Sequence, residues 1–96
     1  MSQYVLSPRA QADLDDIWDY TEDRWGRGQA ERYVRELQSA IEVVARDPKR
    51  ARACDDLRAG YRRFSVGSHV VFVLLEDNKL QVVRVLHQSM DFDQHL

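Results

Sequence analysis

The sequence predicts one α+β domain of order β-α-α-β-β-β, in which a helical hairpin packs on one face of a mostly antiparallel sheet. Three observations support this fold class. Apolar residues recur every three or four positions through the first half of the chain, and every second position through most of the second half. The length of 96 residues is that of one domain, so we expect residues 1–96 to fold as a single unit.

The first helix follows a short opening strand, which we expect at residues 3–6. Ser7 supplies a hydroxyl that can cap a helix start. Pro8 suits the first helical position, where its missing N–H costs no hydrogen bond. Beyond it, apolar side chains at helical spacing predict one core-facing stripe, made of Ala10, Leu14, Ile17, Trp18, Thr21 and Trp25.

The second helix is separated from the first by a tight reversal at residues 26–28, Gly-Arg-Gly. Its end is predicted at Asp47, because Pro48 pushes the preceding residue out of the helical region. Its apolar stripe contains Ala30, Tyr33, Val34, Leu37, Ile41, Val44 and Ala45. We expect the two helices to form an antiparallel hairpin whose stripes face a common core.

The second half of the chain predicts a loop and then three strands. Residues 49–56 are charged and have no period, which indicates the loop. Gly67-Ser68 predicts a turn, and Asp77-Asn78 predicts a primed hairpin turn, which accepts Asp and Asn at positive φ. The strands are expected at residues 60–66, 69–76 and 80–87, and the tail at residues 90–96 either adds a helical turn or packs down without one.

The middle strand is apolar on both faces. Alternation divides its side chains into two sets, Val71, Val73 and Leu75 on one face and Val70, Phe72 and Leu74 on the other. Two helices cover only one face of a sheet, and soluble proteins rarely leave such a patch bare. Two coverings are open: the chain's own tail, through Met90, Phe92 and Leu96, or a second polypeptide.

Composition and charge exclude several classes of protein. The formal net charge of −2 is nearly balanced, although the chain is acidic between residues 13 and 23 and basic between residues 46 and 63. Cys54 is the only cysteine, so no intramolecular disulfide can form. The longest apolar run, residues 70–75, is far shorter than the roughly 20 residues that span a bilayer, and the N-terminus lacks a signal-peptide pattern. We therefore expect a cytoplasmic protein without a membrane association.

No metal or cofactor site is predicted. A zinc site requires ligands at paired spacing, and the histidines show no such spacing with Cys54. Asp15, Asp16 and Asp19 could hold magnesium, but acidic residues at this helical spacing are far more often a solvated face. Phosphate-binding glycine loops and nucleophile-elbow glycines are also missing from the sequence.

One group of residues suggests chemistry. Arg62 and Arg63 fall on the first strand of the predicted hairpin array, Arg84 on the last, and His87 at its end. Converging side chains of this kind could hold a phosphodiester while the histidine moves a proton, as in a metal-free ribonuclease. The alternative is that the arginines are solvated or paired with acidic groups of this chain or of a partner.

Three stretches, YVLSPRAQADLDDIWDYTEDRWG, LRAGYRRFSVGSHVVFV and VVRVLHQSMD, span nearly the whole chain in order. They resemble the ParE toxins of bacterial type II ParDE toxin–antitoxin modules, in the wider RelE/ParE superfamily. The resemblance implies the β-α-α-β-β-β fold predicted above. It also implies a growth-arresting toxin that inhibits DNA gyrase and is neutralised by a ParD antitoxin, whose C-terminal segment folds onto it. Any contact with DNA would be indirect, through the antitoxin or gyrase.

The same superfamily contains ribosome-dependent messenger RNA interferases, which remain the alternative function. Arg84 and one of Arg62 and Arg63 match basic positions of those nucleases. The segment after His87, QSMDFD, lacks the tyrosine that they often place there. A site without its general acid loses about 100- to 10,000-fold in rate, so gyrase inhibition is favoured over RNA cleavage. A degenerate member that only binds an antitoxin is a third hypothesis.

The antitoxin contact is predicted on the uncovered second face of the sheet and on the margins of the helices. A partner segment that folds on binding needs an apolar surface, and an acidic one needs basic neighbours. The predicted contact residues are Val70, Phe72, Leu74, Val82 and Leu86, with Arg62, Arg63 and Arg84 as partners for antitoxin carboxylates.

Overall fold

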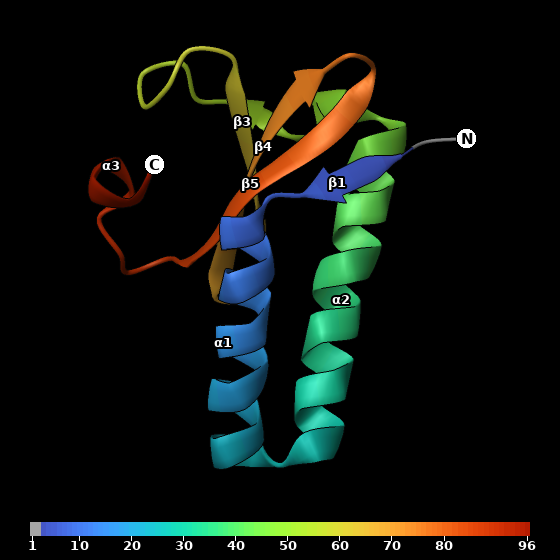
Figure 1. The fold of residues 1–96 in the computed structure, drawn as a ribbon, viewed down its shortest axis with the longest axis vertical. Helices are drawn as coiled ribbons and strands as arrows, with labels where there is room; N and C mark the ends of the chain where they lie inside the picture. The colour runs from blue at the N-terminus through green and yellow to red at the C-terminus, as the bar shows by residue number, and fades with distance from the viewer. Residues whose placement is uncertain (1–2) are drawn as a thin grey trace.

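A computed structural model describes residues 3–96, and these residues form a helical hairpin, a five-stranded sheet and a short C-terminal helix (Figure 1). The predicted α+β class is confirmed. The elements are β1 (Tyr4–Leu6), α1 (Pro8–Trp25), α2 (Arg27–Arg46), the 3-10 turn η1 (Pro48–Arg50), β2 (Arg52–Ala53), β3 (Tyr61–Val66), β4 (His69–Glu76), β5 (Lys79–His87) and α3 (Phe92–His95).

Helix α1 begins where its local sequence indicates. The Ser7 hydroxyl accepts a hydrogen bond from the Ala10 N–H at 3.0 Å, and Pro8 occupies the first helical turn. The far end of α1 differs from the prediction, because Trp25 is 71% exposed instead of buried in the core. Figure 1 shows the reason: both helices of the hairpin continue beyond the end of the sheet, so no strand lies opposite their tips.

The helical hairpin turns at a single residue. Gly26 has φ of +90°, is both the C-cap of α1 and the N-cap of α2, and donates its N–H to the Glu22 carbonyl. A positive φ of this size favours glycine, which has no Cβ to clash. Helix α2 ends at Asp47 as predicted, but the following segment is more ordered than the expected loop. It contains η1 and the two-residue strand β2.

The sheet has the order β1-β5-β4-β3-β2, with β1 parallel to β5 and every other pair antiparallel. Asp77 and Asn78 have φ of 53° and 60°, as the primed hairpin turn between β4 and β5 requires. The register between β4 and β5 shifts after Phe72, which pairs with Arg84, while Val73 pairs with Val82. Strand β5 therefore carries one extra residue, Val83, as a β-bulge.

The bulge corrects one prediction about the sheet faces. Regular alternation would put Val82 and Leu86 on the same face of β5. The extra residue at Val83 reverses the alternation between them, so Val82 belongs to the core beneath the helices and Leu86 to the opposite core. The prediction that both lie on the second face is wrong for Val82.

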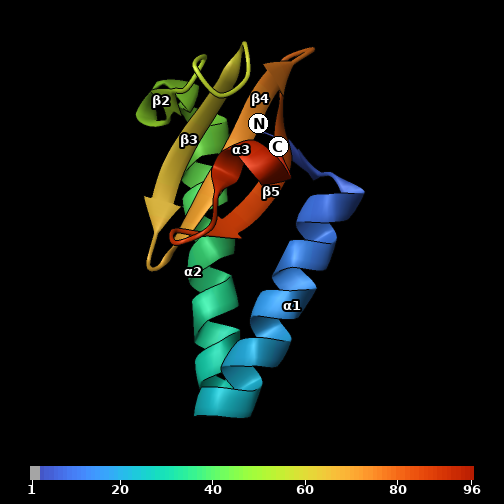
Figure 2. The same cartoon turned by 90° about the vertical axis from the view of Figure 1, so that its left-hand side faces the viewer.

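Two cores lie on the two faces of the sheet. The larger core packs α1 and α2 against β4 and β5, and it includes Leu14, Leu37, Ile41, Val71, Val73 and Val82. The smaller core lies on the second face and contains Cys54, Val70, Phe72 and Leu86. The tail covers this second core through Met90, Phe92 and Leu96, and Figure 2 shows α3 lying over the strands. Of the two coverings that the sequence leaves open, the structure therefore shows the tail.

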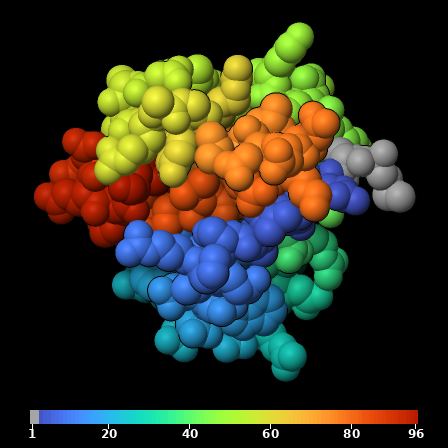
Figure 3. Space-filling view, turned by 45° about the horizontal axis from the view of Figure 1, so that its top comes forward, coloured from blue at the N-terminus to red at the C-terminus, as the bar shows by residue number. Residues whose placement is uncertain are grey.

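Specific contacts fasten the tail to the rest of the chain. The rings of Phe72 and Phe92 meet edge to face, with centroids 5.0 Å apart. Arg58 donates to the Leu96 carbonyl at 2.6 Å and lies 3.5 Å from the Asp93 carboxylate. The tail thus packs beside the segment that contains Arg58 (Figure 3). None of the helices within residues 3–96 is long and apolar enough to cross a membrane.

Candidate functional site

Arg84, the basic residue predicted on the last strand, is held by a carboxylate of α1. Its Nε and Nη2 donate to Asp13 at 2.8 and 2.9 Å, and its Nη1 donates to the His95 carbonyl at 2.9 Å. The two side chains are only 15% and 12% exposed. The hydrogen bond to Asp13 raises the pKa of Arg84, and burial partly opposes it. Three of the five N–H donors of this guanidinium are engaged and Asp13 neutralises its charge, so Arg84 is poorly placed to hold a phosphate while this pair persists.

Asp13 also accepts a hydrogen bond from a backbone group at the edge of the sheet. Strand β1 pairs with β5 only as far as Val82, so the next part of β5 has no strand neighbour on that side. Helix α1 takes over: the Ser7 hydroxyl donates to the Val83 carbonyl at 2.8 Å, and Asp13 accepts from the Val85 N–H at 2.9 Å. The Asp13–Arg84 pair is therefore built into the packing of α1 against β5.

Arg62 and Arg63 point to opposite faces, because successive side chains of a strand alternate. Arg62 pairs with Val73 on the helix side and donates to the Ala51 carbonyl at 2.8 Å. Arg63 pairs with Phe72 on the second face.

His87 lies at the end of β5, where it pairs with His69. The two imidazole rings meet edge to face at 5.4 Å, and the Nδ1 of His87 contacts the Ser89 hydroxyl at 2.7 Å. His69 Nδ1 lies 2.6 Å from the Tyr33 hydroxyl of α2. Burial is the main cause that lowers the pKa of His69, with a further lowering from His87 and a partial opposition from Asp13.

The structure does not gather the four residues of the ribonuclease hypothesis. Arg63 and Arg84 both flank Phe72 on the second face, but Arg84 is occupied by Asp13. Arg62 lies on the other face, and His87 lies at the end of the sheet beside the helices. No common point for a scissile phosphate is formed by these side chains.

The apolar residues predicted to contact an antitoxin are mostly covered. Phe72 is 0%, Leu86 1% and Val70 7% exposed, because the tail packs on them. Val82 lies in the core beneath the helices, and Leu74 is half-buried. These side chains offer no free patch to a partner while the tail stays in place.

Among the open hollows that residues 3–96 form, two are candidate sites instead, and neither was predicted from the sequence. The first, which we call the hairpin hollow, has a volume of about 550 Å³ and lies between the helical hairpin and the β3–β4 turn. Trp25 and Tyr20 at its rim are 71% and 59% exposed. Its lining consists of Ile17, Tyr20, Thr21, Trp25, Gln29, Tyr33, Ser68, His69 and His87.

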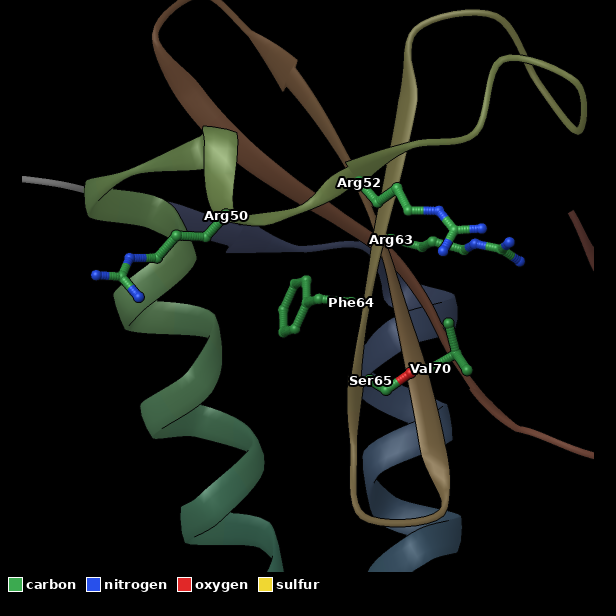
Figure 4. A pocket seen from close by; sticks show the side chains of 6 residues that line it. All are labelled: Arg50, Arg52, Arg63, Phe64, Ser65 and Val70. Carbon is green, nitrogen blue, oxygen red and sulfur yellow. The ribbon is translucent and has the colours of Figure 1, made fainter.

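The second, which we call the arginine hollow, has a volume of about 380 Å³ and lies at the β3 edge of the sheet (Figure 4). It is lined by Arg50, Arg52, Arg63, Phe64, Ser65 and Val70. Figure 4 shows Arg52 and Arg63 pointing to the same side of β3, and Arg50 on the other side with Phe64. The basic run in the sequence signalled the charge, but the pairing of Arg52 with Arg63 depends on a strand that was predicted as loop.

Metal binding finds no donor set in the part of the chain that the structure describes: no three His, Cys, Asp or Glu side chains gather closely enough to hold an ion. Cys54 is a free thiol in the second core. Burial raises its pKa, which favours the unreactive thiol form.

Comparison with known proteins gives consistent matches along the chain. The family model described as "ParE toxin of type II toxin-antitoxin system, parDE" matches residues 4–92. The chain is 55% identical over 96 residues to Toxin ParE1 of Mycobacterium tuberculosis, covering 99% of this chain and 98% of that protein. It is 53% identical over 96 residues to Toxin ParE1 of Caulobacter vibrioides, covering 100% and 99%.

A solved structure supports the same fold. The structure titled "Chromosomal ParDE TA system from P. aeruginosa" aligns with a TM-score of 0.79 at 17% identity, covering 91% of this chain and 96% of the matched chain. At this identity the likeness concerns the fold alone.

Proposed function

This chain belongs to the ParE toxins of type II toxin–antitoxin systems, and we propose that it arrests growth by inhibiting DNA gyrase until a ParD-like antitoxin binds it directly. The proposal makes the chain a binding protein without an enzymatic activity of its own, acting in the cytoplasm, where gyrase is found. Inhibition of gyrase is what membership of the ParE branch implies, whereas RNA cleavage belongs to other branches of the superfamily.

The observation that carries the proposal is the engagement of Arg84 by Asp13. A nuclease needs its cations free to meet the charge that develops on the phosphate. Here Arg84 donates three of its five N–H groups to a carboxylate and a carbonyl, and Asp13 neutralises its charge, while Arg62 bonds to the Ala51 carbonyl. His87, the predicted proton carrier, lies at the end of the sheet and contacts Ser89. This arrangement supports action by binding.

Open aromatic surface supports the same view. Trp25 and Tyr20 present large apolar side chains at the projecting tips of the helical hairpin, beside the hairpin hollow. Tryptophan and tyrosine are enriched among the residues that dominate the binding energy of protein interfaces. Such a surface suits a large protein target.

The test uses purified chain, purified gyrase and relaxed plasmid DNA. We expect the chain to block supercoiling and to increase the amount of cleaved plasmid trapped on the enzyme. Addition of the protein encoded by the adjoining reading frame should restore supercoiling. Unchanged supercoiling at a stoichiometric excess of folded chain would contradict the proposal, and so would growth that continues normally when the chain is overproduced.

The variant His87→Ala separates gyrase inhibition from RNA cleavage. His87 is exposed and its side chain contacts only Ser89 among the hydrogen bonds of the described residues, so its removal should leave the fold intact. Under our proposal growth arrest by the unaltered chain leaves cellular transcripts whole, and His87→Ala, which changes the lining of the hairpin hollow, alters the arrest only as far as it alters gyrase inhibition in the supercoiling assay. Under the interferase alternative, transcripts are cut by the unaltered chain, and the variant loses both the cutting and the growth arrest.

A further inference from the structure

Strand β3 has a free edge beside the arginine hollow. Strand β2 pairs with β3 only at Arg62 and Arg63, since η1 turns the preceding chain away. On this side of β3 the Tyr61 carbonyl accepts a hydrogen bond from the Cys54 N–H. In an antiparallel sheet every second residue directs both its N–H and its carbonyl to the same edge, so residues 61, 63 and 65 all face this edge. By this alternation Ser65 directs its N–H and carbonyl outward, beyond the end of β2. Ser65 is exposed, and its pairing with Val70 on β4 does not use these groups.

Unpaired positive charge surrounds this edge. Arg52 and Arg63 are directly opposite across β2 and β3, an arrangement in which like charges are destabilising. Neither forms an ion pair within residues 3–96, and Arg50 has only a long contact of 3.7 Å with Asp47. A carboxylate placed between Arg52 and Arg63 would relieve their repulsion.

We propose that an extended acidic segment of the antitoxin adds to the free edge of β3, end to end with β2. Its backbone exchanges hydrogen bonds with the N–H and carbonyl of Ser65, and its carboxylates lie on Arg52 and Arg63. This inference rests on the proposed function, which supplies the antitoxin as partner. Addition of a strand to an exposed sheet edge is a recurrent mode of peptide recognition, in which backbone bonds give affinity and side chains give specificity.

A peptide fits this surface better than a nucleic acid does. Phosphates would use the arginines but would leave the outward carbonyl of Ser65 without a donor, whereas a strand supplies both a donor and an acceptor. The hollow of about 380 Å³ also offers the partly buried ring of Phe64 to an apolar side chain of the segment.

The first experiment measures the affinity of the protein encoded by the adjoining reading frame for two charge-reversal variants. Arg52→Glu/Arg63→Glu should weaken binding by about tenfold or more and reduce its salt dependence. The matched control is Arg32→Glu/Arg35→Glu, which reverses two exposed arginines of α2 that do not line the arginine hollow. We expect the control to bind within about twofold of the unaltered chain, since it leaves the proposed contact intact.

The second experiment tests the backbone contact. Ser65→Pro removes the outward N–H without removing a bond of the β3–β4 ladder, as proline is tolerated on strand edges, and should weaken binding by about three- to tenfold. Ser65→Ala keeps the N–H and should bind as the unaltered chain does. Amide hydrogen exchange in the unaltered chain gives a readout that requires no variant: exchange of the Ser65 amide should slow when the antitoxin binds.

The outcomes separate the two proposals. If the unaltered chain binds the antitoxin but the arginine reversal binds equally well and the Ser65 amide is not protected, this inference is overturned and the proposed function stands. If only the arginine reversal weakens binding, without protection of Ser65, strand addition is overturned. If Arg52→Glu/Arg63→Glu binds the antitoxin with unchanged affinity but its complex no longer binds DNA, the two arginines contact DNA phosphates, and strand addition is overturned as well. An unaltered chain that binds no antitoxin overturns both proposals.

Discussion

Replacing Asp13 by alanine is expected to destabilise the chain by about 3 kcal/mol, at the lower end of the cost of removing one partner from a buried ion pair. The side chains of Asp13 and Arg84 are 12% and 15% exposed, so the arginine left behind has little access to water. The substitution also leaves the Val85 N–H without its acceptor, because this group donates to Asp13 at 2.9 Å. Since domains of this kind are stable by about 5–15 kcal/mol, the loss would be a large fraction of the total.

Urea denaturation followed by circular dichroism measures this effect. With a slope of about 1.5 kcal/mol per molar, the midpoint should fall by about 2 M. The control is Asp15→Ala, two positions along the same helix, whose carboxylate has only an exposed contact with Gln11. This control should change the free energy of unfolding by no more than about 0.5 kcal/mol.

A double-mutant cycle identifies the cause. Arg84→Met should also destabilise, because it leaves the Asp13 carboxylate buried without its cation. The double variant Asp13→Ala/Arg84→Met should be more stable than the sum of the two changes by about 2 kcal/mol, since no unpaired charge remains. Additive changes, or a cost below about 1 kcal/mol for Asp13→Ala, would refute the view that this pair holds α1 to β5. Arg84 would then be free for other contacts, and the main support for a non-enzymatic toxin would be lost.

Three further perturbations test other parts of the fold. Phe92→Ala should cost about 2 kcal/mol and increase the binding of a hydrophobic dye, because the second core loses its cover; unchanged dye binding would show that the tail does not seal that face. Gly67→Ala should cost about 1–3 kcal/mol in the same urea titration, since φ is +55° and an added Cβ would lie 2.7 Å from the Tyr33 ring. Gly28→Ala is the control: an added Cβ there has no neighbouring atom within 4 Å, so this change should be neutral or stabilising. Burial lowers the pKa of His69 below its ordinary value of 6.5, so folding favours its neutral form. The stability that this contributes is present above pH 6.5 and is lost as the pH falls through the folded pKa. The difference in stability between pH 7.5 and pH 5 should therefore shrink in His69→Asn, and an unchanged difference would contradict this prediction.

Local features of this fold were predictable because neighbouring residues determine them. The cap at Ser7, the proline that follows it, and the primed turn at Asp77-Asn78 depend on groups a few positions apart. The two periods of the apolar pattern likewise assign the helices and the main strands. The ends of the elements are determined less sharply by neighbouring residues, so small differences remain, such as β3 beginning at Tyr61 instead of residue 60.

The candidate site was less predictable, since it depends on contacts between distant segments. Arg84 looked available for phosphate because its partner, Asp13, is 71 positions away in the chain. The arginine hollow needs β2, whose two residues have no period of their own and form a strand only because β3 pairs with them.

By itself the sequence determined the order of the helices and strands and, through its three characteristic stretches, the ParE family. Only the tertiary structure decided which surfaces remain open. The bulge at Val83 places Val82 and Leu86 in different cores, the tail closes the second face, and Trp25 projects past the sheet. The physical reason is that periodicity says which side chains avoid water, whereas the element that covers each of them is selected by long-range packing.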